Sequence, residues 1–227
     1  YSACSTFTGS LIIASSFLEN NNLNNIIVST SSSNLVAEKQ FRFPIEYGAI
    51  RKKVNTFTAT GAVSSLITKK KTNIKIESAT IGKVCDIGYK DTNNMGACMA
   101  FSAAKTIYEH LKETKRKPEY YDLILTGDLG KYGINILKEY LNKEYDLEIN
   151  NINDAGYLLF QNEETIAGGS GPTCLPLILF NKILKEDYKK ILLVATGSLH
   201  SKTSSNLGKS IPSISHAVSL EVIKWYI

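Results

Sequence analysis

Several features that mark common classes of protein are rare or missing in these 227 residues. The cysteines stand far apart without any CxxC spacing, so the sequence holds no recognisable zinc-binding pattern; they are Cys4, Cys85, Cys98 and Cys174. No secretory signal is recognisable, so we expect reduced thiols in a cytoplasmic compartment rather than a disulfide framework. The longest apolar runs fall far short of the ~20 residues that cross a bilayer, so we expect no transmembrane segment.

Other absences narrow the range of ligands. Basic residues do not alternate with aromatic ones, so nothing in the sequence favours nucleic-acid binding. The glycine-rich run at residues 168–171 lacks the following Gly-Lys-Ser/Thr of a phosphate-binding loop, and no acidic cluster resembles a calcium loop. The net charge of +5 is mild and fits an ordinary surface as well as one that attracts anions. We expect no cofactor and no metal ion bound by the protein itself.

A short unit that occurs three times is the most informative feature that is present. Each copy consists of a turn of small residues, an apolar segment with helical spacing, and a buried strand that ends in Thr or Thr-Gly. The copies cover residues 3–30, 95–127 and 171–197. Repeated helix–strand units predict an α/β fold built by duplication. We divide the chain at residue 85, into an N-terminal half at residues 1–85 and a C-terminal half at residues 86–227.

Local patterns assign most of the chain to helices and strands. Helices are expected over residues 5–18, 96–115, 130–141 and 174–184. Strands are expected over residues 26–29, 74–77, 123–126, 157–160, 191–197 and 216–221. Residues 63–67 fit either type of element. Residues 35–55 look irregular, with the polar and aromatic composition that often accompanies function.

Cys4 is the best candidate for a reactive group. It stands where a helix begins, and the backbone N–H groups of a helix start favour a thiolate. The alternative is a small buried cysteine without chemistry, and the sequence leaves both open. Residues 168–171 present a similar choice, between a backbone nest for a carboxylate or oxyanion and an ordinary tight turn.

Few side chains are available to assist Cys4. Only His200 and His216 stand where they could approach it, and no histidine adjoins the glycine run. A cysteine without a positioned base is a poor nucleophile. Lys39 and Arg42, in the irregular stretch, could bind a carboxylate or could be solvated surface charges.

Several motifs carry a resemblance to known families. The Ala-Cys-Ser-Thr run at residues 3–6 resembles the nucleophile segment of thiolase-fold ketoacyl synthases and thiolases. More specifically, the chain is similar to the stage V sporulation protein AD family. The similar segments follow one another along essentially the whole chain, at residues 37–48, 94–96, 121–130, 194–197 and 211–219.

The resemblance implies a thiolase-like fold with a duplicated five-layer αβαβα architecture. Its first half would be incomplete here, with roughly a hundred residues preceding residue 1. The resemblance also implies a homodimer that works with other stage V sporulation membrane proteins, either cytoplasmic or peripheral on the spore inner membrane. The implied ligand is dipicolinic acid or its calcium chelate, bound for uptake into the developing spore.

Departures from the thiolase pattern favour binding over catalysis. Where thiolases have a histidine before the second glycine run, this sequence has Thr165 or Ile166, and residues 209–212 lack the second thiolase cysteine. We therefore expect a protein that is not an enzyme, with Cys4 as a vestigial nucleophile. The expected ligand-binding residues are Cys4, Ser5, Lys39, Arg42, Gly168, Gly169, Ser170, Gly171 and His216.

Two alternatives remain open. A cysteine-dependent acyltransferase or ketoacyl synthase-like condensing enzyme would use Cys4 as nucleophile and His200 or His216 as base. A scaffold with a vestigial pocket would instead recruit membrane partners through its surface.

Overall fold

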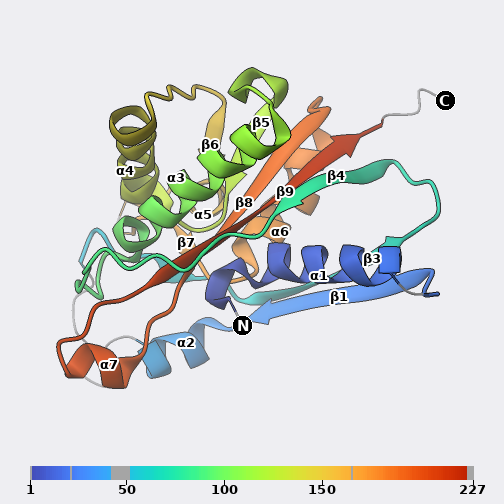
Figure 1. Cartoon of the computed structure of the whole chain (residues 1–227). Coiled ribbons are helices and arrows are strands. Elements are labelled where there is room, and N and C mark those ends of the chain that lie inside the picture. Colours follow the sequence, from blue (N-terminus) through green and yellow to red (C-terminus); the bar gives the residue numbers. More distant parts are fainter. Residues whose placement is uncertain (1, 21, 42–51, 165, 224–227) are drawn as a thin grey trace.

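The computed structural model describes residues 2–20, 22–41, 52–164 and 166–223, which Figure 1 shows in colour. The helices are α1 (Thr6–Asn20), α2 (Asn34–Phe41), α3 (Met95–Thr114), α4 (Gly130–Tyr145), α5 (Ala155–Leu159), α6 (Cys174–Asn181) and α7 (Lys202–Asn206), with 3-10 turns η1 (Ala3–Ser5), η3 (Pro118–Tyr120) and η4 (Ile183–Lys185). The strands are β1 (Asn25–Ser32), β2 (Phe57–Thr58), β3 (Gly61–Thr68), β4 (Ile74–Thr80), β5 (Leu123–Thr126), β6 (Ile152–Asp154), β7 (Gly169–Ser170), β8 (Lys190–Ser198) and β9 (Ser213–Val222).

A five-stranded sheet in the order β4-β9-β8-β5-β6 lies at the centre of the molecule. β5 runs parallel to β6 and β8, while β9 runs antiparallel to β8 and β4. α3 and α4 cover one face of this sheet, and α1 and α6 lie on the other (Figure 1). Because both faces are covered, β5 and the middle of β8 are buried along their length, which explains their continuous apolar sequences.

Alternate residues of the central strands belong to two separate cores. Leu123 and Leu125 of β5 pack with Phe7 of α1 and Leu175 of α6. Ile124, between them, packs instead with side chains of α3 and α4. The first of these cores holds α1 and α6 against the same face of the sheet.

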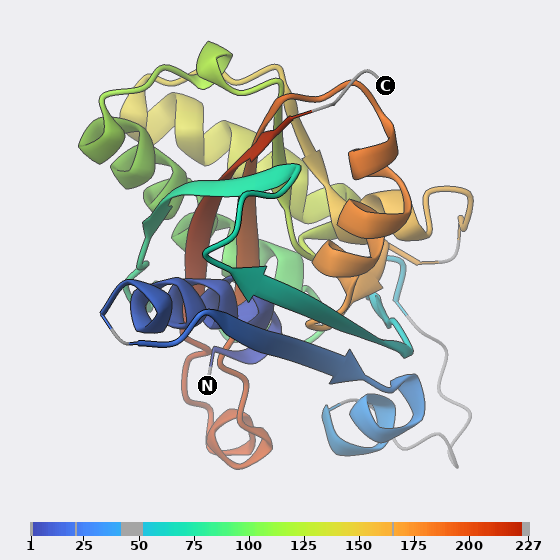
Figure 2. The same cartoon turned by 90° about the vertical axis from the view of Figure 1, so that its right-hand side faces the viewer.

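A two-stranded antiparallel ribbon, β1–β3, forms a further layer beyond α1 (Figure 2). Val28 of β1 packs into the core of α1 and α6, whereas Ile27 and its cross-strand partner Leu66 are 70% and 62% exposed. Neither strand carries a charged residue, and no second strand in the described ranges pairs with β1. The layers are therefore helices, sheet, helices and sheet, which are four of the five expected.

The sequence repeat is visible in the topology. α1 leads into β1 and then antiparallel β3, and α6 leads into β8 and then antiparallel β9. The third copy runs from α3 into β5, which lies parallel to β8. β4 precedes residue 85 but joins the large sheet beside β9, and the division at residue 85 stays a prediction.

Two local predictions are wrong. Residues 157–160 were expected to form a strand, but α5 covers most of them. The helix forms because the Asp154 side chain accepts a hydrogen bond from Tyr157 N at 2.9 Å and caps it. Residues 34–41 form α2 within the stretch expected to be irregular, of which residues 42–51 lie outside the described part. Residues 63–67, for which both types were open, lie in β3.

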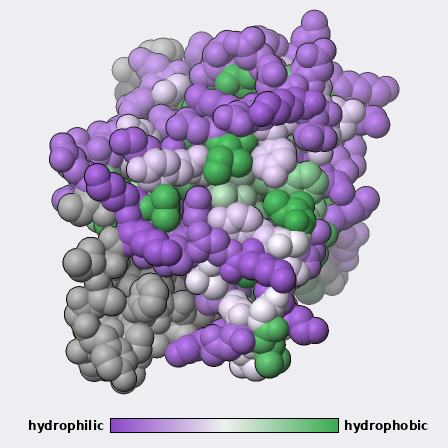
Figure 3. Space-filling model, turned by 90° about the vertical axis from the view of Figure 1, so that its left-hand side faces the viewer, coloured by the Kyte–Doolittle hydropathy of each residue, from purple (hydrophilic) through white to green (hydrophobic). Residues whose placement is uncertain are grey.

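Figure 3 shows one face of the molecule, the one on the left of Figure 1. Seen from the left of Figure 1, the surface is mainly hydrophilic, with hydrophobic side chains in separate spots (Figure 3). Such spots are usual for folded domains. Within the described residues, no helix combines the length and the apolar character needed to cross a membrane.

Two glycines let α3 and α4 approach closely and so fix the loop between β5 and α4. A side chain at Gly96 would overlap the carbonyl oxygen of Leu129, and a Cβ at Gly133 would lie 2.8 Å from Gly96 Cα. Contacts this short do not occur in folded proteins, so neither position accepts a methyl group unless the helices separate. The loop fixed in this way contains Asp128.

Gly96→Ala is expected to lower the free energy of unfolding by about 2 kcal/mol or more, because overpacking against backbone cannot be relieved by side-chain rotation. Gly9→Ala is the matched control, since a Cβ there makes an ordinary 3.5 Å contact with His216 Cδ2. Alanine at this helical position should stabilise by up to about 1 kcal/mol. Urea denaturation compares the two variants, and equal stabilities would contradict the close approach of α3 and α4.

Candidate functional site

A cavity of about 1070 Å³ lies beside Cys4. Its walls come from the turn before α1, the end of β1 with the start of α2, the segments 55–58 and 170–172, and the stretch 198–206 that contains α7. Asp128 and the start of α3 complete the lining. These segments are distant in the sequence, so the cavity exists only in the folded chain.

Cys4 is presented to this cavity by a tight turn in front of α1. It lies in η1, where Ser5 N donates to Ser2 O at 3.0 Å. Ala3 adopts the left-handed region, with φ of 47°, which is uncommon for alanine and marks local strain. At the end of β8, Gly197 lacks a side chain that would overlap Ser2 O. The structure thus places Cys4 at a helix start that faces a cavity, as the sequence indicates.

The Cys4 thiol is held in its protonated form. Burial raises its pKa well above the ordinary value of 9.0, and the negative charge of Asp128 and a hydrogen bond to that carboxylate raise it further. A backbone hydrogen bond with Gly171 acts in the opposite direction and is the smallest of these effects. A thiol that does not ionise near neutral pH is a weak nucleophile.

Asp128 occupies the position beside Cys4 where a catalytic base would be useful. It is only 1% exposed, and its Oδ1 accepts a hydrogen bond from Thr196 Oγ1 at 2.7 Å. Its Oδ2 accepts from Gly171 N at 3.0 Å and, more weakly, from Ser170 Oγ at 3.4 Å. Burial and the charge of Asp154 raise the pKa of Asp128 to about 6, although the bonds from Thr196 and Gly171 favour the carboxylate.

A second buried carboxylate, Asp154, fixes the loop that carries Asp128. Asp154 is fully buried and accepts four hydrogen bonds. Leu129 N, Gly130 N and Tyr157 N each donate at 2.9 Å, and Thr126 Oγ1 donates at 2.7 Å. These bonds cap α5 and immobilise the turn from β5 into α4. Asp128 therefore has a fixed place on the cavity wall.

The glycines of residues 168–171 are needed mainly for the backbone conformation and for close packing. Gly168 and Gly171 have φ values of 140° and 103°, which suit glycine. A Cβ at Gly169 would lie 3.0 Å from Cys174 Sγ. Ser170 and Gly171 line the cavity, whereas Gly168 and Gly169 are not part of its described lining. The Gly171 N–H, which we expected to be available for a ligand carboxylate, is bonded to Asp128 instead.

His216 supports the N-terminal turn and does not appear in the cavity lining. Its Nδ1 accepts a hydrogen bond from Gly82 N at 3.1 Å, so in the neutral ring Nε2 carries the proton and donates to Ser2 Oγ, also at 3.1 Å. Burial lowers the pKa of His216 and keeps the ring neutral. Ser5, another expected ligand residue, is fully buried and donates to Ser2 O at 2.8 Å.

The other two histidines are placed differently. His110 is buried, with Thr80 Oγ1 at 2.9 Å from Nδ1 and Tyr121 Oη at 2.8 Å from Nε2, so it belongs to the packing between α3 and the sheet. His200 lines the cavity, and burial lowers its pKa. The ionisable groups that act on the Cys4 thiol are Asp128 and Cys174.

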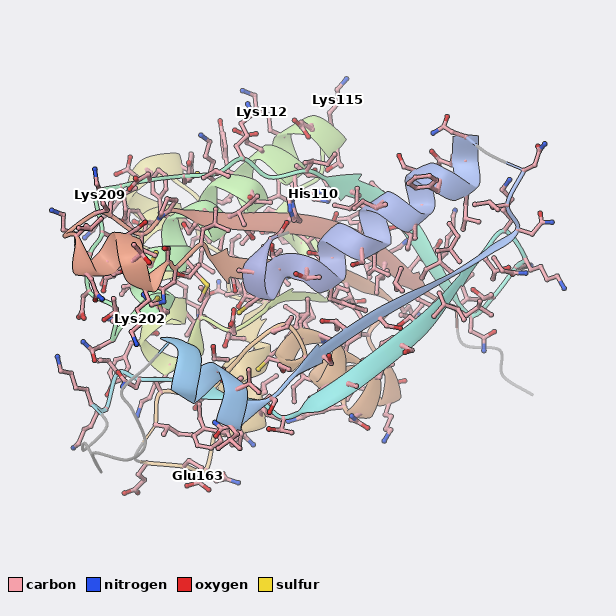
Figure 4. The ribbon with its side chains drawn as sticks, turned by 90° about the horizontal axis from the view of Figure 1, so that it is seen from below. His110, Lys112, Lys115, Glu163, Lys202 and Lys209 are labelled. Carbon is pink, nitrogen blue, oxygen red and sulfur yellow. The ribbon has the colours of Figure 1, made fainter. Side chains whose placement is uncertain are left out.

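Two cavity residues were not anticipated from the sequence. Lys202, at the start of α7, lines the cavity and lies between α7 and α2, while Lys209 lies on the other side of α7 (Figure 4). Asn55 also lines the cavity and is 6% exposed, and its Oδ1 has no hydrogen-bond partner within the described part of the chain. A buried polar atom without a partner in a cavity is a natural contact for a ligand. The only sequence signal for Lys202 was its place just after a buried strand.

The remaining predicted residues can be located only in part. Lys39 lies in α2, where the structure describes its backbone but not its side chain. Arg42 lies outside the described residues. In the described ranges, no group of three or more His, Cys, Asp and Glu side chains could hold a metal ion.

Comparison with known sequences gives a consistent result. The family model for stage V sporulation protein AD matches residues 1–221 of this chain. The chain is 37% identical over 226 residues to the stage V sporulation protein AD of Bacillus subtilis (strain 168), a match that covers 97% of this chain and 67% of the relative.

Comparison with solved structures supports the thiolase-like fold. 3-Oxoacyl-[acyl-carrier-protein] synthase III from Aquifex aeolicus VF5 has a TM-score of 0.60 and 18% identity, over 97% of this chain and 65% of that one. The corresponding synthase from Pseudomonas aeruginosa PAO1 has a TM-score of 0.58 and 10% identity, over 98% and 66%. This chain thus spans just under two thirds of the length of these synthases. At such identities the likeness concerns the fold alone.

Asp128→Asn is expected to stabilise the protein at pH 8. The pKa of Asp128 is about 6 in the folded chain, whereas the ordinary value is 3.8. The free energy of unfolding therefore falls as the pH rises from about 4 to 6. With 1.36 kcal/mol for each pKa unit, the buried carboxylate costs about 3 kcal/mol above that range, and asparagine removes most of this cost. Chemical denaturation from pH 8 down to pH 4 should show the gain shrinking. A variant less stable than the wild type at pH 8 would refute this account.

Proposed function

Because this chain belongs to the stage V sporulation protein AD family, we propose that its cavity binds dipicolinic acid, or the calcium chelate of that acid, for uptake into the developing spore. Dipicolinic acid is a small aromatic dicarboxylate. The protein acts as a binder that does not transform its ligand. The single observation that carries this proposal is the pairing of the Cys4 thiol with the Asp128 carboxylate, which disfavours the thiolate.

The chemistry of this pair supports binding without catalysis. An acyl-transferring cysteine needs a thiolate and donors for the oxyanion that forms on attack. Here the pKa of Cys4 is raised, so the thiolate is disfavoured. The Gly171 N–H, which could serve an oxyanion, already binds Asp128. A negative charge developing beside Cys4 would face the carboxylate of Asp128 rather than a donor.

The rest of the cavity supports an aromatic dicarboxylate as ligand. Lys202 supplies a positive charge at the cavity. The Oδ1 of Asn55, which has no partner within the described part of the chain, is an acceptor and offers no hydrogen bond to a carboxylate. The hydroxyl group of Thr58 adds a donor on the cavity wall. Apolar side chains such as Met99 offer surface for the faces of a ring. Calcium would arrive already chelated by the ligand.

Membership of the family also underlies the proposals about partners and location. We infer that the protein works with other stage V sporulation membrane proteins, on the spore inner membrane or in the cytoplasm beside it, and as a homodimer. The alternative is a scaffold that recruits its partners through its surface and does not use the cavity. Ligand-binding measurements distinguish this scaffold from a binder of dipicolinic acid.

One further candidate function is an active acyltransferase or condensing enzyme. The observation in its favour is that Cys4 stands at a helix start on a cavity wall, in a fold shared with synthases. Of the two histidines considered, His200 would have to be its base, since both ring nitrogens of His216 are engaged with Gly82 and Ser2.

Titration calorimetry of the longest available form of the protein with dipicolinate tests the proposal. We expect one binding site per chain and weaker binding of isomers whose carboxylates are not adjacent to the ring nitrogen. Lys202→Met should weaken binding about tenfold or more, because a charged hydrogen bond contributes about 1.5 kcal/mol or more. Lys209→Met, on the opposite side of α7, is the matched control and should bind normally. A folded protein that gives no heat with dipicolinate would refute the proposal.

Intact-protein mass spectrometry after incubation with acetyl-coenzyme A and longer acyl-coenzymes A separates the two functions. We expect no acyl adduct at Cys4 at pH 7, because the thiol is protonated and its oxyanion donor is occupied. Rapid acylation that disappears in Cys4→Ala would establish the enzyme instead.

A further inference from the structure

Asp128 places a negative charge where a bound dicarboxylate would also be negative. It lines the cavity, and Oδ2 takes the Gly171 N–H that would otherwise offer a hydrogen bond to the ligand. A dicarboxylate that enters the cavity therefore meets a fixed carboxylate instead of a free donor. Two like charges brought together in a buried site cannot both remain without a large electrostatic cost.

The neighbours of Asp128 provide hydrogen bonds but no compensating positive charge. Thr196 of β8 and Gly171 of the glycine run donate to it, and Cys4 of η1 shares a hydrogen bond with it. The charged or titratable groups that face it from the packed elements are Cys4, Cys174 of α6 and Asp154 of the β6–α5 junction. Within the described part of the chain, none of these is a cation.

We propose that Asp128 takes up a proton from solvent when a free dicarboxylate binds, so that ligand and proton enter the cavity together. This inference rests on the proposed function. One O–H bond forms on the carboxylate, and no other bond is made or broken. The neutral carboxyl group still accepts from Thr196 and Gly171, and its new hydrogen can be donated to a carboxylate oxygen of the ligand or retained toward Cys4.

The surroundings of Asp128 already prepare it for this step. Its pKa of about 6 means that at pH 7 about one molecule in ten carries the proton before any ligand arrives. A nearby dianion raises that pKa further, so the bound form is protonated over the neutral range. The apparent affinity should then fall about tenfold for each pH unit above 6, and level off below 6.

His200 is the other cavity group that could accept the proton. It lines the same cavity, and its lowered pKa makes the free ring neutral at pH 7, so a dianion could protonate it as well. The experiment must therefore separate Asp128 from His200. Asp128→Asn and His200→Gln each remove one titrating group while keeping similar size and polarity.

Calorimetry at pH 7 in buffers of different ionisation enthalpy counts the protons taken up with dipicolinate. We expect nearly one proton per ligand for the wild type and for His200→Gln, and none for Asp128→Asn. Asp128→Asn should also bind with an affinity that is independent of pH between 6 and 8. The neutral one-to-one calcium chelate should bind the wild type with little proton uptake, because it adds no net charge.

The outcomes distinguish this inference from the function on which it rests. Dipicolinate binding without proton uptake by the wild type would overturn the role of Asp128 and leave the binding function intact. Proton uptake that persists in Asp128→Asn and is lost in His200→Gln would also overturn the role of Asp128. The absence of any binding by a folded wild type would refute the proposed function, and this inference with it. An absence of proton uptake by the wild type overturns the inference even if a variant fails to fold.

Discussion

The four hydrogen bonds accepted by the buried carboxylate of Asp154 determine how the cavity is built. They hold the backbone of Leu129 and Gly130 at the start of α4, the hydroxyl of Thr126 at the end of β5, and Tyr157 N at the start of α5. A carboxylate with this many donors remains stable in the interior without a cation. The loop that brings Asp128 beside Cys4 is positioned by this one side chain.

Asp128 gains its properties from that arrangement. It lies close enough to Asp154 for its pKa to rise, and close enough to Gly171 to bond the turn that precedes α6. It therefore links the glycine run to the β5–α4 loop and at the same time suppresses ionisation of Cys4. The fold is that of condensing enzymes, but the groups around the cysteine favour a neutral thiol. Such a site suits holding a ligand better than attacking one.

The fold was largely predictable because its repeat units are encoded by local patterns. The helical spacing of residues 96–115 and the buried run at residues 123–126 correspond to α3 and β5. α5 was missed because four consecutive apolar residues fit a strand equally well, and the choice is made by the side chain of Asp154. Such a cap depends on tertiary packing, which local patterns do not contain.

The site was less predictable, since it depends on which side chains the fold brings together. Cys4, Ser170 and Gly171 could be placed at the cavity because each stands at a turn before a helix in a repeat unit. Asp128 looks in the sequence like an ordinary turn residue, and only the sheet brings it beside Cys4.

His216 illustrates the opposite case. A histidine at the start of a strand near the cysteine suggested a ligand contact, yet its ring bonds Gly82 and Ser2. The role of Lys39 and Arg42 as carboxylate partners stays a prediction, as does any part for Ser5, Gly168, Gly169 and His216 in binding.

The outer face of the ribbon β1–β3 carries no charged side chain. Its outer face pairs Ile27 with Leu66 and Ser29 with Ser64, without a single lysine or glutamate to repel another molecule. Natural sheets usually protect open strands with charge, and this ribbon lacks that protection. Another surface that packs against this face would therefore meet apolar and hydroxyl groups and no opposing charge.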